Sequence, residues 1–217
     1  MNVRWYFLGM FFNCVFLASC SPEAPAPNVD RHLESGRTYY EQGQYNASMI
    51  EARSALQIDA SNEAANLLMS DIYLSLGMAR QALKILQSID SESYDYNLRL
   101  IDAMLAVGKY GTSLHLLRQS EGVFAGNEIE SLLRVAEARI GLRDIESASL
   151  SYQKVLDLDA LNIDATLGLI AIDAATGSLE RADAGLLAVL ENDPDHLDTL
   201  ILLANVYLRQ GRFEEAE

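Results

Sequence analysis

Residues that could do chemistry are few and scattered in this sequence. Three histidines lie far apart, and none has cysteine, histidine or carboxylate neighbours at a spacing typical of metal ligands: His32, His115 and His196. There is no glycine-rich phosphate loop and no nucleophile motif. Among the many carboxylates, those of Asp157, Asp159, Glu191, Asp193 and Asp195 fall in expected loops, where solvated charge is their usual role. We therefore expect no catalytic residue, metal, cofactor or small-molecule substrate, and predict that the chain is not an enzyme.

One cysteine stands where its thiol would be modified. Arg4 precedes a mostly apolar run, Trp5 to Leu17, which is shorter than the roughly 20 residues of a membrane-spanning helix and is typical of a secretory signal. The run ends in Leu17-Ala18-Ser19-Cys20, which resembles the lipobox of bacterial lipoproteins. The resemblance implies that residues 1–19 are removed and that Cys20 receives a diacylglycerol. The acylated N-terminus would then hold the protein on a membrane.

The next residues are expected to form a tether. Residues 20–28 carry three of the four prolines and no aliphatic residue larger than alanine, which is typical of a semi-rigid spacer. Ser21, rather than aspartate, follows the cysteine, so the lipoprotein resemblance favours the periplasmic face of the outer membrane in the cell envelope. Two alternatives stay open, an ordinary signal peptide with an unrelated cysteine and an uncleaved N-terminal anchor.

The composition favours a packed helical protein and argues against some partners. Half of the residues are hydrophobic and only four are prolines. Removal of Arg4 with the signal leaves 15 basic against 31 acidic residues, a net charge of −16. Such a surface repels nucleic acid and anionic headgroups, so we expect neither as a partner. Loss of Cys14 and acylation of Cys20 leave no disulfide.

A repeated pattern covers the rest of the chain. A small residue recurs at intervals of 34, 31, 35, 34 and 34 residues, at Ser48, Ala82, Ser113, Ala148, Ala182 and Ala216. In five of these repeats a glycine stands just before it, at Gly43, Gly77, Gly108, Gly177 and Gly211. Arg143 takes the glycine's place in the remaining repeat. Self-similarity at this period predicts a solenoid of stacked units.

Each repeat is expected to form two helices joined by a tight turn. The glycine supplies the left-handed conformation that ends the first helix. The small residue near the start of the second helix lets the two backbones approach closely. Apolar residues recur at spacings of three and four, and Leu83, Leu86 and Ile89 are an example at a spacing of three. They give each helix a core-facing stripe. One such hairpin cannot bury its apolar faces alone, so the units must stack.

This pattern resembles the tetratricopeptide repeat. The resemblance rests on the period near 34, on closing loops such as Asp159-Ala160-Leu161-Asn162, and on tyrosines at the eleventh place, Tyr39, Tyr73 and Tyr207. It implies an all-α, right-handed superhelical solenoid of helix-turn-helix units over residues 29–217. The expected units cover 29–62, 63–93, 94–128, 129–162, 163–196 and, incomplete, 197–217. The fourth-place tryptophan of the family is missing, and only one unit has the loop proline, Pro194.

The last repeat stops one residue after its small position. A second helix that begins near Phe213 and ends at Glu217 cannot close a hydrophobic core, and a solenoid needs a polar cap. We therefore expect this chain to be the N-terminal part of a longer protein.

The resemblance also implies a concave groove lined by the first helix of each unit. Carried over by position, an apolar row consists of Leu33, Leu67, Leu98, Leu133, Leu167 and Ile201. The row beside it consists of Arg37, Asp71, Asp102, Glu137, Ala171 and Asn205. The three consecutive acids favour a protein segment with basic side chains and apolar anchors as the ligand. The alternative is that these acids are only a solvated helix face.

Together these expectations describe a non-enzymatic scaffold anchored at the cell envelope. A signal, a lipobox, a proline-rich spacer and immediate repeats resemble the lipoproteins of the exosortase (PEP-CTERM) and exopolysaccharide system. One alternative is a lipoprotein of pilus or outer-membrane-protein assembly. Another is the N-terminal scaffold of an enzyme whose catalytic domain follows Glu217.

Overall fold

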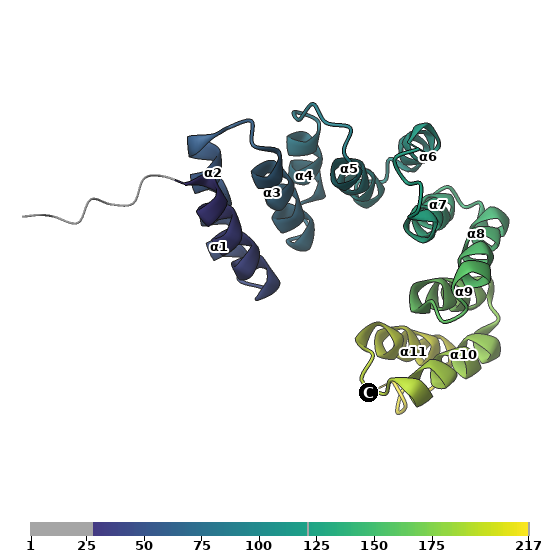
Figure 1. The fold of residues 1–217 in the computed structure, drawn as a ribbon. Helices are drawn as coiled ribbons and strands as arrows, with labels where there is room; N and C mark the ends of the chain where they lie inside the picture. The colour runs from purple at the N-terminus through teal and green to yellow at the C-terminus, as the bar shows by residue number, and fades with distance from the viewer. Residues whose placement is uncertain (1–27, 121, 217) are drawn as a thin grey trace, which may run out of the picture.

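The computed structural model describes residues 28–120 and 122–216, so the expected signal peptide, Cys20 and most of the tether lie outside the described residues. Within them the chain forms eleven α-helices and no strand: α1 (Val29–Glu41), α2 (Tyr45–Ile58), α3 (Glu63–Ser75), α4 (Ala79–Leu86), α5 (Tyr94–Ala106), α6 (Tyr110–Gln119), α7 (Glu128–Gly141), α8 (Ile145–Leu158), α9 (Ile163–Thr176), α10 (Leu179–Asn192) and α11 (Leu197–Gln210). Consecutive helices form antiparallel pairs that follow an arc (Figure 1). The expected all-α solenoid is confirmed. None of the described helices has the length and apolar character needed to cross a membrane.

The turns inside the helix pairs share one backbone geometry. The five repeat glycines have φ between 70° and 94°. Arg143 has φ 62° and is the only non-glycine residue with positive φ in the described part of the chain. In the first turn, the amide N–H groups of Gly43 and Gln44 donate to the carbonyl oxygens of Tyr40 and Tyr39, at 2.9 and 2.8 Å. The predicted left-handed helix ends are therefore confirmed.

The small residues of the repeat are buried between the paired helices. Ser48, Ala82, Ser113, Ala148 and Ala182 expose none of their surface. The Ser48 hydroxyl donates to the carbonyl oxygen of Gly36 at 2.7 Å and so ties α2 to α1. A larger side chain at these places would force the two helices apart.

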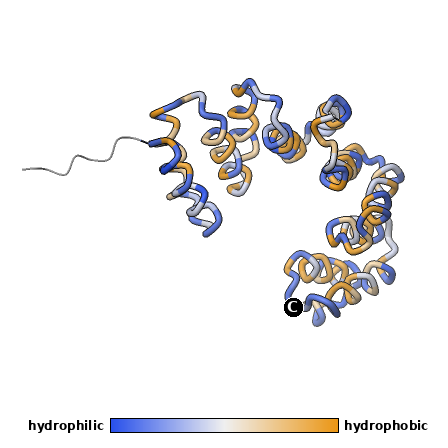
Figure 2. The backbone as a smooth tube through the Cα atoms, viewed as in Figure 1, coloured by the Kyte–Doolittle hydropathy of each residue, from blue (hydrophilic) through white to orange (hydrophobic). Residues whose placement is uncertain are grey.

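The hydrophobic core is a row of small clusters. The first joins α1, α2 and α3 through residues such as Leu33 and Ile72. The last joins α9, α10 and α11 through residues such as Leu186 and Val206. Figure 2 shows hydrophobic and hydrophilic residues alternating along the helices throughout the arc. Each unit is therefore stabilised by its neighbours, as in other solenoids.

The connection between α6 and α7 departs from the repeat. Residues 120–127 separate these helices, whereas the other connections are shorter. Phe124 within this connection is 3% exposed and packs beside Ile101 and Leu117. Its ring meets that of Tyr94 edge-on, with centroids 5.5 Å apart. The longer connection therefore supplies part of the core of the third unit.

The odd-numbered helices line the inner side of the arc, as Figure 1 shows for α7, α9 and α11. Neighbouring inner helices contact one another, as do α1 with α3, α3 with α5, α5 with α7, and α9 with α11. In the described chain, α7 and α9 come less close than these pairs. Tyr152 of α8 fills the space, since its ring lies 2.4 Å from where a Cβ on Gly168 would stand. A tyrosine from an outer helix thus spaces two inner helices.

Candidate protein-binding groove

The apolar row expected in the groove belongs mostly to the core. Leu33 and Leu67 each expose only 8% of their surface and pack in clusters between units. Leu98 and Leu133 are half-buried against the clusters of the third and fourth units. The expectation of a free row is therefore corrected for Leu33 and Leu67, because inner helices that pack side by side cover these positions. Leu133 keeps part of its surface in the groove, where it lines a cavity.

Two of the three groove acids are paired within the chain. The Asp71 carboxylate accepts a hydrogen bond from Nε of Arg99 at 2.7 Å. The Asp102 carboxylate accepts from Nε and Nη2 of Arg134 at 2.7 and 3.2 Å. Each arginine stands on the next inner helix, so the two pairs, here called the arginine ladder, link α3 to α5 and α5 to α7. Asp71 and Asp102 are therefore not open acids, which corrects the role expected of them. Arg37 is exposed and makes no ion pair among the described residues.

The third acid, Glu137 of α7, has no such partner. Arg99 and Arg134 are 35 residues apart, and a further step of 34 residues reaches Gly168 on α9. No side chain in residues 28–120 and 122–216 donates a hydrogen bond to Glu137. Its carboxylate is open to solvent but stands inside the concave curve. The surrounding protein displaces part of its hydration and so raises the pKa of this carboxyl.

Glu137 lines an open cavity of about 460 Å³ that lies between α7, α9 and α11. Its lining includes Leu133, Glu137, Tyr152, Asp164, Leu167 and Asp198. We call this space the central cavity. Four carboxylates and one arginine contribute to its lining, so its formal charge is −3. The central cavity therefore combines apolar walls with a surplus of negative charge.

Tyr152 brings a hydroxyl to the central cavity. The residue is only 6% exposed, yet it lines this space. Burial, with the carboxylates of Glu137 and Asp164, raises the pKa of Tyr152 to about 12. The hydroxyl therefore keeps its proton at neutral pH and can both donate and accept a hydrogen bond. The sequence pattern did not indicate Tyr152, because the family resemblance implies a groove lined by the first helix of each unit and Tyr152 lies on a second helix, α8.

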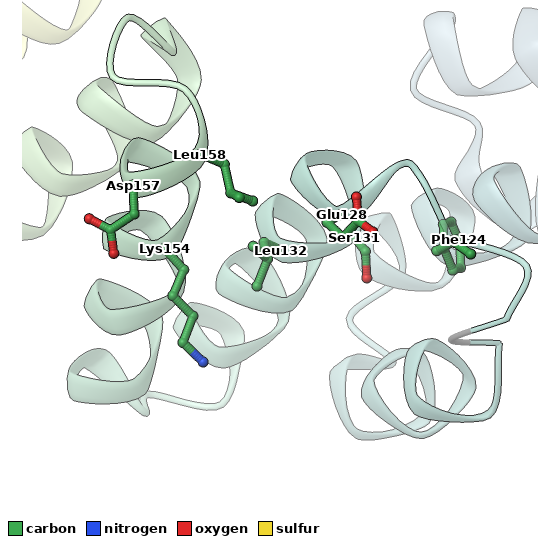
Figure 3. Close-up of a pocket in the computed structure, with 8 residues that line it drawn as sticks. Phe124, Glu128, Ser131, Leu132, Lys154, Asp157 and Leu158 are labelled. Carbon is green, nitrogen blue, oxygen red and sulfur yellow. The ribbon is translucent and has the colours of Figure 1, made fainter.

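A second hollow, of about 590 Å³, shares no lining residue with the central cavity. It lies where the α6–α7 connection and the start of α7 meet the end of α8. Figure 3 shows Leu132 and Leu158 near one end and Phe124 at the other, with Glu128 and Ser131 between them. Its lining is largely apolar and comes from separate segments, which is why the repeat pattern did not reveal it.

His32 and His196 take part in local contacts, whereas His115 is exposed on α6. Nδ1 of His32 lies 2.6 Å from the Glu51 carboxylate. His196 caps the start of α11, where its Nδ1 accepts the amide N–H of Thr199 at 3.3 Å. Across the part of the chain that the structure describes, no three histidine, cysteine or acidic side chains converge as a metal site. The groove thus offers binding chemistry, with carboxylates, a tyrosine hydroxyl and apolar walls.

Comparisons with known proteins agree with this fold. The tetratricopeptide repeat family model matches residues 186–217. Similar solved structures include TTC0263, a tetratricopeptide-repeat protein of Thermus thermophilus, with TM-score 0.64 and 20% identity over 83% of this chain and 100% of that chain. PilW, a type IV pilus biogenesis factor, has TM-score 0.68 and 16% identity over 87% of this chain and 88% of its own. Pseudomonas aeruginosa pilF has TM-score 0.63 and 14% identity over 87% and 86%.

Among curated proteins, none matches this sequence. The solved structures named above are less than 25% identical in sequence to this chain, so the likeness shows the fold alone. The same fold is indicated by the six spaced repeats, by the shared left-handed turns and by the family match over residues 186–217. The described residues therefore have the tetratricopeptide-repeat fold.

Proposed function

We propose that this chain is a non-enzymatic scaffold that binds a segment of another protein in its concave groove. The central cavity carries the proposal, because it places apolar walls beside unpaired carboxylates on the inner side of a solenoid. Contacts with Leu133 and Leu167 would bury apolar anchors of the segment. The negative charge would attract and orient its basic side chains. The expected ligand is therefore an extended or helical segment with both kinds of residue.

We propose in addition that a lipid on Cys20 holds the scaffold at the periplasmic face of the outer membrane. The lipobox-like sequence and the proline-rich tether support this proposal. Exopolysaccharide or exosortase-type envelope assembly is the process proposed first, on the resemblance of the N-terminal organisation. Pilus assembly is the second candidate, because PilW and pilF are among the structures with this fold.

Site-specific photo-crosslinking in the native host tests the groove. A photoreactive phenylalanine derivative would replace Ala171, which lines the central cavity on α9. The matched control would replace Leu150, which is 57% exposed on α8 and lines neither cavity. We expect one envelope protein to be captured from Ala171 and not from Leu150, through a peptide with basic and apolar residues. Capture of the same set of proteins from both positions would contradict binding in the groove. The identity of the captured protein would separate exopolysaccharide from pilus assembly.

A further inference from the structure

The arginine ladder lacks its next arginine. Asp71 and Asp102 each receive a guanidinium from the following inner helix. At the equivalent place of the helix after that, Gly168 has no side chain to offer Glu137. Glu137 thus occupies the ladder's acid position without the cation that the two preceding acids hold.

The space of the missing side chain is occupied only in part. The Tyr152 ring packs against the Gly168 backbone, where a Cβ would stand 2.4 Å from the ring. This side chain belongs to a residue that is only 6% exposed, and its hydroxyl makes no hydrogen bond to any residue that the structure describes. It lines the same cavity as Glu137 and Asp164, whose charges both act on it. The hydroxyl oxygen of this otherwise buried residue reaches the cavity beside two carboxylates and has no hydrogen-bond partner among the described residues. A donor on a ligand could therefore replace water at this oxygen.

We propose that Glu137, Tyr152 and Asp164 bind the guanidinium of an arginine from the captured protein segment, in place of the arginine that the ladder lacks. This inference rests on the proposed function and names the side chain that the groove selects. A guanidinium is planar and carries five N–H donors, so it can donate to a carboxylate and to the tyrosine oxygen at once. The tyrosine proton would then point to the remaining carboxylate.

The surroundings suit the rest of an arginine side chain. Its aliphatic stem would lie along Leu133 and Leu167, which line the same cavity. Arg134 is the one cation in the lining, and its guanidinium is already held by Asp102. Asp198 adds a further negative charge from α11. The surplus of carboxylates over arginine leaves room for one more positive charge.

Short blocked peptides titrated into the full, isotope-labelled chain test this proposal by NMR. The probe is acetyl-Leu-Arg-Leu-amide, and its controls carry lysine or the neutral arginine analogue citrulline at the central position. We expect the arginine peptide to shift the amide resonance of Gly168 at millimolar concentration. The citrulline peptide should leave it unchanged, and the lysine peptide should bind more weakly. Glu137→Gln should weaken binding about tenfold, as expected for loss of a charged hydrogen-bond partner, whereas Glu146→Gln on the exposed side of α8 should not.

A second variant supplies the missing arginine from the chain itself. Gly168→Arg would collide with the Tyr152 ring, so it is combined with Tyr152→Ala and compared with Tyr152→Ala alone. The double variant, if its helical circular dichroism is retained, should no longer bind the arginine peptide. Equal shifts from the arginine and citrulline peptides, no shift from the arginine peptide, or unchanged affinity in Glu137→Gln would each overturn the proposal. If crosslinking from Ala171 still captures a partner in that case, the groove function stands and only the arginine site is wrong.

Discussion

Replacement of Arg143 by glycine should stabilise the protein. Arg143 is the one turn residue that adopts φ 62° with a side chain, while the other five turns use glycine. A left-handed conformation costs an L-residue about 1–2 kcal/mol. Glycine avoids this cost but loses about 0.5–1 kcal/mol more conformational entropy on folding. The net gain in the free energy of unfolding should therefore be about 0.5–1 kcal/mol.

The side chain of Arg143 contributes little else to the free energy of unfolding. Arg143 is exposed, and its side chain makes no hydrogen bond or ion pair with the described residues. The two backbone bonds of its turn, from the amides of Arg143 and Asp144 to the carbonyl oxygens of Ile140 and Arg139, are both 2.9 Å and need not change. For a chain of this size the gain corresponds to a rise in melting temperature of about 1–4 °C.

Urea unfolding followed by far-ultraviolet circular dichroism provides the measurement, with the dependence on urea concentration compared between variants. The reciprocal control is Gly43→Arg, at φ 70° and with no atom within 4 Å of an added Cβ. It should lose about as much stability as Arg143→Gly gains, about 0.5–1 kcal/mol. A loss of stability in Arg143→Gly, or no loss in Gly43→Arg, would refute the argument from backbone conformation.

Three further predictions concern the contact between Tyr152 and Gly168, the carboxylate of Glu137 and the proposed lipid on Cys20. Gly168→Ala should lower the free energy of unfolding by about 1–3 kcal/mol, because the new methyl group meets the Tyr152 ring, and the loss should shrink in a Tyr152→Ala background. Glu137→Gln should be more stable than the parent at neutral pH. Because the pKa of Glu137 is raised, the folded chain binds this proton more tightly than the unfolded chain. The parent therefore loses stability as pH rises from about 4 through that pKa, and the variant does not. Urea midpoints that changed equally with pH in both proteins would contradict this prediction. Cys20→Ala should abolish fatty-acid labelling and move the protein out of the membrane fraction, and unchanged fractionation would argue against a lipid anchor.

The turns and helix contacts could be predicted because they follow from local rules. The glycine and the small residue of each repeat act within a few residues of their own turn, and the structure buries the small residue as predicted in the first five repeats. In the sixth repeat, Ala216 is half-buried in a turn. Even the departure at Arg143 was visible, since the spacing of the repeat marks the place where a glycine is missing.

The groove could be predicted less well because its chemistry depends on neighbouring units. Asp71 and Asp102 have the residue types of an open acidic patch, but their partners lie on the next inner helix, about one repeat away in sequence. The spacing of Arg99 and Arg134 by 35 residues is the signal that would have shown the pairing. Tyr152 reaches the groove from an outer helix, so no list of inner-helix positions could include it.

Because α7 and α9 come less close than the other neighbouring inner helices, we expect the arc to bend most easily between them, at a point here called the pivot. Other neighbouring inner helices touch, so a change of angle between them compresses side chains that are already packed. At the pivot, the spacing depends on the Tyr152 ring against Gly168. Because units contact only their neighbours, a tilt at this point is carried to both tips of the molecule. A ligand that displaces or holds the ring would therefore change the angle at the pivot. We then expect the distance between α1 and α11 to change when the ligand binds.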